Sequence, residues 1–329
     1  MNKDLSLGQN LHASQDYKMT NEQQYSRMDI GPQYDGDSAF MRQCRLQQSN
    51  YRATVLRQPC GVGPARNSNV HYGNMLFDGD ISGSNFVSGA AFRYAQQRAR
   101  DKVICNDLTL DEFRLFNNML SSMPLCFNMF SDLRALLLID EHACTQAIKA
   151  LFRELDWIDS VLYIGVEFIP VPTENYIDDK TAFDALIIVA DSRGQRGVIT
   201  VETKYTDLLG KNTSKKNDKK NDLVRQAKLF HPTRADELAQ LGYTQLYRNF
   251  LLTYAYAKRH KMANWTNVTI SPREDHRSKQ EIEELVASLT VSGKNLHKID
   301  LDDFFRRGVL SGVTGVADVY QKLQARYTP

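Results

Sequence analysis

The sequence predicts an α/β fold in which a mixed central β-sheet is flanked by helices, with an additional helical section at the N-terminus. Three strand-like apolar runs follow one another in the middle of the chain, at residues 160–171, 182–191 and 197–207. Helical periodicity precedes them and resumes after them, most clearly over residues 243–260. The order of helices, three strands, helix, strand and helix is typical of an α/β core.

Composition sets broad limits on the class of protein. The chain has 329 residues, of which 42% are hydrophobic, enough to bury a sizeable core. Lys and Arg total 41 against 39 for Asp and Glu, so any basic surface must be local. The five cysteines are scattered without a Cys-x-x-Cys pair, which indicates reduced thiols. Because we find no signal peptide and no long apolar run, we expect a cytoplasmic protein without membrane contact.

The N-terminal third is predicted to consist of two parts. Residues 1–40 are rich in Gln, Asn, Asp, Tyr and Ser without a sustained period, which predicts a mobile arm or an arm ordered by a partner. Residues 41–125 are predicted to form a helical section, with a basic helix near residues 42–57. The Gly/Pro/Asn-rich residues 58–74 are interpreted as a connecting loop, because they lack the Gly-Lys-Ser/Thr ending of a phosphate-binding loop.

Helices are predicted before the strands as well. A basic helix is expected at residues 88–104, and Thr109 followed by Glu112 predicts a capping box at the start of the next one. Residues 124–155 read as two amphipathic helices with an apolar stripe that we assign to the core. The stripe consists of Phe127, Phe130, Leu133 and Leu137.

A strongly basic segment follows the strands. Residues 211–228 hold seven Lys/Arg and two Asp, and we interpret them as a solvated loop. The alternative is contact with a nucleic-acid backbone. The candidate phosphate-binding side chains are Lys215, Lys216, Lys219 and Lys220.

Charged residues interrupt the predicted sheet at one place. Side chains alternate along a strand, so Glu202 and Lys204 point to the same face. Asp184 begins the preceding apolar strand, and the short connection at residues 191–197 brings the two strands side by side. An isolated Glu-x-Lys is most often a surface ion pair, but buried carboxylates are costly unless they are paired or bound to metal. The sequence therefore predicts that these three charges converge.

This combination of groups suits phosphate chemistry. Asp184 and Glu202 can supply oxygen ligands for Mg²⁺, with Mn²⁺ as an alternative. Lys204, within reach of the same point, can orient or deprotonate a water and offset charge that builds up on phosphorus. This is the layout of a phosphodiesterase.

The pattern of Asp184, seventeen further residues and then Glu202-Thr203-Lys204 resembles the PD-(D/E)xK nuclease superfamily. The wider sequence is similar to a bacterial group of restriction endonucleases within it, from about residue 125 to the C-terminal "ARY". The shared features ahead of the Asp strand are Phe127, Asn128, Phe130 and Glu167. One departure is that Phe183, where the superfamily motif has Pro, precedes Asp184.

The resemblance implies a restriction-endonuclease-like core at residues 126–329 and a set of site residues. The implied metal ligands are Asp184, Glu202 and the backbone carbonyl of Thr203, and the implied catalytic residues are Asp184, Glu202, Lys204, Glu167 and Gln245. For Glu167, a further ligand or supporting carboxylate and a carboxylate paired with Arg remain equal alternatives. Arg248, one turn after Gln245, is the weaker candidate on that helix.

These observations favour a Mg²⁺-dependent DNA endonuclease, and the resemblance adds a role in defence against foreign DNA. The first alternative is a nuclease-fold protein that binds nucleic acid or a partner without cutting, and the second is a hydrolase of small phosphoesters. The expected partner is DNA, with a homodimer or a second protein component compatible with the resemblance. A groove for DNA is expected to be lined by the basic stretches near residues 42–57, 93–102 and 211–228.

Overall fold

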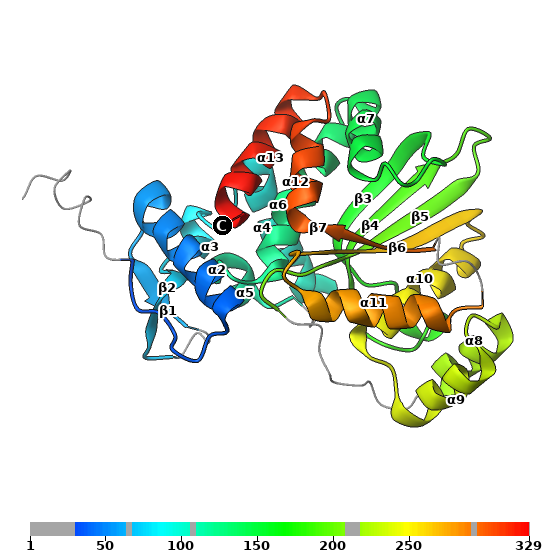
Figure 1. Ribbon diagram of the computed structural model, residues 1–329. Helices are drawn as coiled ribbons and strands as arrows, with labels where there is room; N and C mark the ends of the chain where they lie inside the picture. The colour runs from blue at the N-terminus through cyan, green and yellow to red at the C-terminus, as the bar shows by residue number, and fades with distance from the viewer. Residues whose placement is uncertain (1–29, 64–67, 106–109, 208–217, 291–294, 329) are drawn as a thin grey trace, which may run out of the picture.

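A five-stranded mixed sheet forms the centre of the molecule (Figure 1). The structure, a computed structural model, describes residues 30–63, 68–105, 110–207, 218–290 and 295–328. The strands, in their order across the sheet, are β3 (Ser160–Phe168), β4 (Phe183–Ala190), β5 (Arg196–Thr203), β6 (Asn264–Ser271) and β7 (Leu296–Asp300). β3, β4 and β5 are antiparallel neighbours, whereas β5, β6 and β7 run parallel. The predicted mixed sheet is confirmed.

Helices cover both faces of this sheet (Figure 1). One face carries α6 (Ser122–Leu137), α7 (Glu141–Leu151) and α12 (Leu301–Val309), with α4 (Gly89–Cys105) and α13 (Thr314–Tyr327) packed outside them. The other carries α10 (Gln245–Arg259) and α11 (His276–Ser288), with α8 (Asp218–Ala227) and α9 (Pro232–Leu241) beside them. Strand alternation divides the core accordingly: Ile187 and Val201 join the α6 side, and Leu186 and Val198 join the α10 side.

The N-terminal section contains short elements beside this core. They are α2 (Ala39–Asn50), the π-helical turn Tyr51–Leu56, β1 (Cys60–Val62), β2 (His71–Leu76), α3 (Gly79–Ser82) and α5 (Glu112–Asn117), and a 3₁₀ turn, Thr173–Asn175, lies between β3 and β4. The prediction of a plain loop at residues 58–74 is wrong, because β1 and β2 pair there. A Cβ at Gly73 would lie 2.1 Å from the carbonyl oxygen of Ile30, so glycine here permits close backbone approach within a strand.

The basic segment after the strands also differs from the prediction. Residues 218–227 form helix α8 where a loop was expected, and residues 211–217 lie outside the described residues. α8 is held by its buried side: Val224 and Lys220 are each 2% exposed, and the Lys220 ammonium lies 2.6 Å from Asp179. This strongly charged segment thus forms a helix that packs on the protein, because the buried Lys220 is paired with the carboxylate of Asp179.

The predicted capping box lies partly outside the described residues, since Thr109 is not among them. The described N-cap of α5 is Asp111, whose side chain accepts a hydrogen bond from the Arg114 amide at 3.0 Å. The cap therefore has the predicted chemistry at a different residue.

A buried arginine joins the two ends of the described chain. Arg326 of α13 is 0% exposed and donates hydrogen bonds to Gln48 Oε1 at 3.1 Å and to the Asn85 carbonyl at 2.9 Å. One hydrophobic cluster includes both Cys44 and Tyr327, so α2 shares the core of the sheet. The division of the chain near residue 125 stays a prediction.

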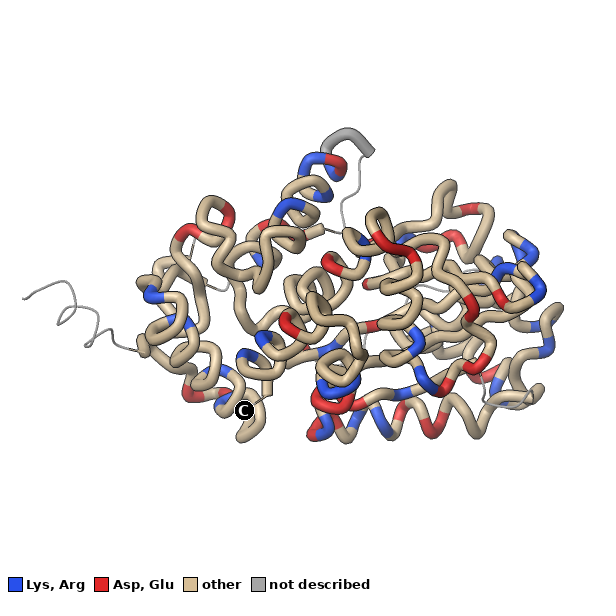
Figure 2. The backbone as a smooth tube through the Cα atoms, turned by 90° about the horizontal axis from the view of Figure 1, so that it is seen from above, with Lys and Arg blue, Asp and Glu red and all other residues tan. Residues whose placement is uncertain are grey.

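Charges of both signs are interspersed along the chain (Figure 2), as the small net charge of +2 leads one to expect. Among the described residues, the helices all fall short of the length and apolar character needed to span a membrane.

Candidate active site

Glu202 and Lys204 form a buried ion pair at the end of β5. Lys204 Nζ lies 2.7 Å from Glu202 Oε1, and the two side chains are 7% and 1% exposed. Both side chains face α10, as strand alternation predicts. Burial by itself would lower the pKa of Lys204, but the carboxylates of Glu202 and Asp184 outweigh it and the net shift is upward.

Asp184 reaches the same point from the neighbouring strand. Ala185 pairs with Val201 in the antiparallel register, and Asp184 Oδ2 accepts a hydrogen bond from the Thr203 amide at 2.7 Å. Burial, followed by repulsion from Glu202 and Glu167, raises the pKa of Asp184 well above its usual value, and Lys204 opposes the shift. The predicted convergence of the Asp, Glu and Lys is therefore present in the structure.

Glu167 sits at the end of β3, on the strand next to Asp184, and is 5% exposed. Its φ of 52° is in the left-handed region, which is uncommon for a residue other than glycine. Arg98 of α4 donates to the carbonyl oxygens of Glu167 at 2.7 Å and Val166 at 3.3 Å, and so holds this turn of backbone in place. Arg98 belongs to the stretch 93–102 that was expected to line a DNA groove, but it instead fixes the end of a core strand.

The first turns of α10 supply amide groups that hold Glu202. Gln245 donates from Nε2 to Glu202 Oε1 at 2.6 Å and accepts from Lys204 Nζ at 3.1 Å, so one amide bridges the acid and the amine. Asn249, one turn later, donates from Nδ2 to Glu202 Oε2. Sequence reasoning missed Asn249, although its i, i+4 spacing from Gln245 places both on one helix face.

An open cleft of about 470 Å³ is lined by Asp184, Glu202, Lys204 and Gln245, among others. Its described lining includes five carboxylates against four cationic side chains. The carboxylates are Glu167, Asp179, Asp184, Glu202 and Asp207, and the cations are Arg114, Lys180, Lys204 and Arg248. The cleft thus carries a small excess of negative charge around two buried acids.

Asp179 forms the centre of a charge cluster on one wall of this cleft. Its Oδ2 lies 2.6 Å from Lys220 Nζ and 3.4 Å from Arg248, and its Oδ1 accepts from Thr181 at 2.9 Å. Burial would raise the pKa of Asp179, but the hydrogen bonds from Lys220 and Thr181 and the two cations lower it overall. Asp179 therefore anchors α8 to the wall of the site.

The candidate phosphate-binding lysines separate into three groups. Lys220 is buried against Asp179, so its ammonium is not at the surface, whereas Lys219 is half-buried on α8. Lys215 and Lys216 lie outside the described residues. In the stretch 42–57, Arg45 and Arg52 are buried and form hydrogen bonds within the protein. The expectation that this stretch lines a DNA groove is therefore wrong for these two arginines.

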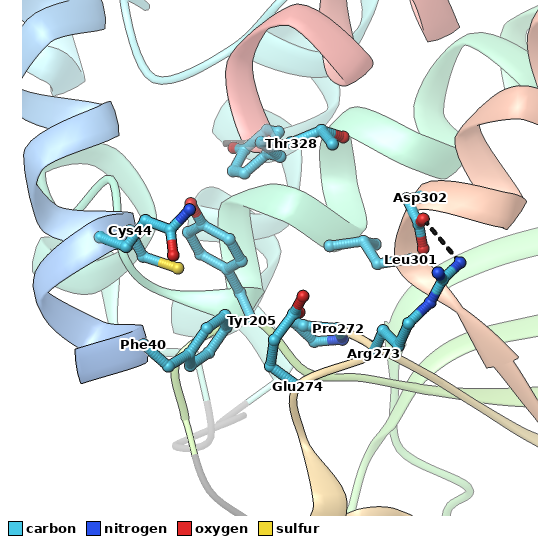
Figure 3. Close-up of a pocket in the computed structure, with 11 residues that line it drawn as sticks. Phe40, Cys44, Tyr205, Pro272, Arg273, Glu274, Leu301, Asp302 and Thr328 are labelled. Atoms are coloured by element: carbon cyan, nitrogen blue, oxygen red, sulfur yellow. Dashed lines mark hydrogen bonds and ion pairs between the residues drawn. The ribbon is translucent and has the colours of Figure 1, made fainter. Parts of the chain in front are cut away.

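Tyr205, the residue after Lys204, contacts the N-terminal section and not the cleft. Tyr205 points away from the cleft, toward α2, where its hydroxyl accepts from Gln48 at 3.2 Å. Figure 3 shows it beside Phe40 and Cys44, and all three residues line a separate cavity of about 140 Å³. The chain just after β5 therefore directs Lys204 to the site and Tyr205 to the N-terminal section.

Together the fold and the site define an α/β protein whose Asp strand and Glu-x-Lys strand are antiparallel neighbours. A sequence profile of the PD-(D/E)XK nuclease superfamily matches residues 35–329, nearly the whole chain. The chain belongs to this superfamily, which confirms the resemblance inferred from the motif. Neither a curated protein nor a solved structure matches the chain significantly.

Nucleases of this superfamily generally use divalent metal ions, and the chemistry of the donor set fits such an ion. Among the described residues, no cluster of three or more His, Cys, Asp or Glu side chains has the arrangement of a metal site. The carboxylates of Asp184 and Glu202 nevertheless converge here, and desolvation followed by their repulsion raises the pKa of Asp184. A hard divalent cation prefers oxygen ligands and relieves that repulsion.

Replacing Asn249 by Ala is expected to lower activity or metal affinity by about 10- to 100-fold, as is usual for residues that orient a metal ligand. Without Nδ2, Glu202 Oε2 loses its donor and the carboxylate can rotate. Calorimetric titration with Mn²⁺ and cleavage assays over a range of Mg²⁺ concentrations would measure the effect. The matched control is Asn175→Ala, an exposed position whose removal should change neither value. Equal metal affinity and equal rates for Asn249→Ala and wild type would contradict this role.

Proposed function

We propose that this protein is a metal-dependent DNA endonuclease that hydrolyses phosphodiester bonds. The observation that carries the proposal is the meeting of Asp184, Glu202 and Lys204 in one cleft, with Gln245 bonded to both members of the ion pair. Keeping such a set buried is costly for a protein that only binds nucleic acid. Membership of a nuclease superfamily supports the same chemistry.

The residues have distinct parts in the proposed mechanism. Asp184, Glu202 and the Thr203 carbonyl would hold Mg²⁺, with Mn²⁺ as an alternative, and the bound ion would supply a polarised water and neutralise charge on the phosphate. Lys204 Nζ orients the attacking water and offsets negative charge on the scissile phosphate. Gln245 and Asn249 keep Glu202 in one orientation, which limits reorganisation during the reaction.

Substrate contacts would come from cations near the cleft. Arg114, Lys180 and Arg248 line its walls and suit phosphates on either side of the scissile bond. Lys215, Lys216 and Lys219 are proposed as further phosphate contacts at the start of the α8 region. Glu167 lies close enough in the cleft to serve as an additional acid beside the metal.

The likeness to restriction endonucleases extends the proposal to defence against foreign DNA in the cytoplasm. A homodimer, or a second protein component, would bring two such sites to the two strands of a duplex.

Removal of divalent metal should abolish cleavage. The test compares plasmid, linear duplex DNA, single-stranded DNA and RNA in Mg²⁺, in EDTA, and after Mg²⁺ or Mn²⁺ is added back. We expect EDTA to slow DNA cleavage by at least about 100-fold, since a catalytic metal contributes several kcal/mol, and added metal to restore it. The proposal fails if no nucleic acid is cut in Mg²⁺ or Mn²⁺, or if cleavage continues at the same rate in EDTA.

A further inference from the structure

A second cavity adjoins the catalytic cleft on the side of the N-terminal section. Its volume is about 420 Å³, within the range of ligand pockets. Asp207 lines both the second cavity and the catalytic cleft, whereas Thr206 lines the second cavity and not the cleft. The chain from Lys204 to Asp207 therefore leads directly from the proposed catalytic lysine to the second cavity.

Two tyrosines form an aromatic wall of this second cavity. The rings of Tyr34 and Tyr72 are 6.2 Å apart and nearly perpendicular. Tyr34 is 51% exposed, so much of its ring is open to a ligand. The apolar part of the lining includes Met41, Met75 and Leu120. A large exposed aromatic ring beside an apolar surface in a concave site suits a flat, partly apolar group.

Arg45, a cation that lines this second cavity, is already neutralised by Asp37. Arg45 lies 5.9 Å from the Tyr34 centroid and 5.4 Å from the Tyr72 centroid. Its guanidinium is bonded to both carboxylate oxygens of Asp37, at 2.5 and 3.0 Å, and to Asn74 Oδ1. Because Asp37 and Asn74 already occupy the Arg45 guanidinium, Arg45 supports the two tyrosine rings and does not serve as a phosphate-binding cation.

An amide donor completes the second cavity. Asn118 accepts hydrogen bonds on Oδ1 from Asn74 at 3.1 Å and from the Leu120 amide at 3.0 Å. Within the described part of the chain, its Nδ2 has no acceptor. An amide N–H₂ of this kind can donate to a ring nitrogen or carbonyl oxygen on the edge of a nucleobase.

We propose that the second cavity binds one unpaired nucleobase of the substrate strand, stacked on the exposed ring of Tyr34 beside Tyr72, while a neighbouring phosphate occupies the catalytic cleft. The inference rests on the proposed nuclease function and adds a substrate class to it. A base held in a duplex cannot enter the cavity, so the strand must be single or the base must leave the helix. Every base has a flat face that can stack on tyrosine, so the protein should prefer single-stranded DNA without sequence specificity.

Binding to single-stranded DNA should therefore depend on Tyr34. Fluorescence anisotropy would compare a labelled single-stranded oligonucleotide with a blunt duplex of the same sequence, using the full chain with Lys204→Ala in Mg²⁺ to suppress cleavage. Adding Tyr34→Ala should weaken single-strand binding by about 5- to 100-fold, the usual effect of one base–aromatic stack, and leave duplex binding unchanged. Tyr34→Phe, which keeps the ring, should bind like the parent.

The matched control is Tyr163→Ala, a 39% exposed tyrosine on β3 outside both cavities, which should not alter binding. Equal single-strand affinity for Tyr34→Ala and the parent, or an equal loss for duplex and single strand, would overturn the base site. Parallel cleavage assays on otherwise wild-type protein separate the two proposals. If wild type cuts DNA while Tyr34→Ala binds normally, only the base site is wrong, and if wild type neither binds nor cuts nucleic acid, both proposals fall.

Discussion

Replacing Lys204 by Ala, or Asp184 by Asn, is expected to slow Mg²⁺-dependent DNA cleavage by about 100- to 10,000-fold. Lys204→Ala removes the ammonium that lies 2.7 Å from Glu202, and Asp184→Asn removes the half-buried acid beside this ion pair at nearly constant volume. Because the two groups act on the same water and phosphate, the double variant should be little slower than either single variant. Single-turnover cleavage of a labelled DNA measures all three rates.

The control for these variants is Lys180→Ala, which removes a positive charge from the same cleft at an exposed position. It should weaken substrate binding while changing the single-turnover rate at saturating enzyme by less than about 10-fold, because a phosphate contact mainly positions the substrate. Circular dichroism and thermal melting establish that each variant is folded. If folded Lys204→Ala or Asp184→Asn cuts DNA as fast as wild type, the catalytic assignment is wrong.

Replacing Arg326 by Met should lower the free energy of unfolding by about 3–5 kcal/mol. The guanidinium is fully buried and donates to Gln48 Oε1, the Asn85 carbonyl and Asn85 Oδ1, and it lies 4.9 Å from the Tyr327 ring centroid. Removing it leaves the buried oxygens Gln48 Oε1 and Asn85 Oδ1 without this donor, each costing about 1–3 kcal/mol, whereas the Asn85 carbonyl keeps a hydrogen bond from Asn128 at 3.0 Å. Relief of the cost of burying a cation offsets part of that sum.

Urea denaturation followed by fluorescence measures this change. The matched control is Arg273→Met, where the side chain is 67% exposed and paired with Asp300 and Asp302 at the surface. We expect that variant to lose no more than about 1 kcal/mol, as surface ion pairs usually do. An Arg326→Met protein within about 1 kcal/mol of wild type would mean that the buried network contributes little.

Local patterns allowed much of the fold to be predicted. The strands β3, β4 and β5 and the helices α6 and α10 are long, periodic segments, so the residues themselves indicate their type. β1 and β2 could not be predicted, because a glycine such as Gly73 indicates a loop when only the sequence is known. The structure shows that this glycine stands in a strand where the Ile30 backbone passes close beside it. α8 was missed because the partner of Lys220 is Asp179, a residue on a distant segment.

The same contrast applies within the candidate site. By itself the sequence determined that Asp184, Glu202 and Lys204 form one set, because strand alternation sets the face of each side chain and a short connection pairs the strands. Only the tertiary structure decided what surrounds that set. Gln245 and Asn249 meet Glu202 across 43 and 47 residues of chain, and the rotation of α10 against the sheet depends on the packing of the whole core.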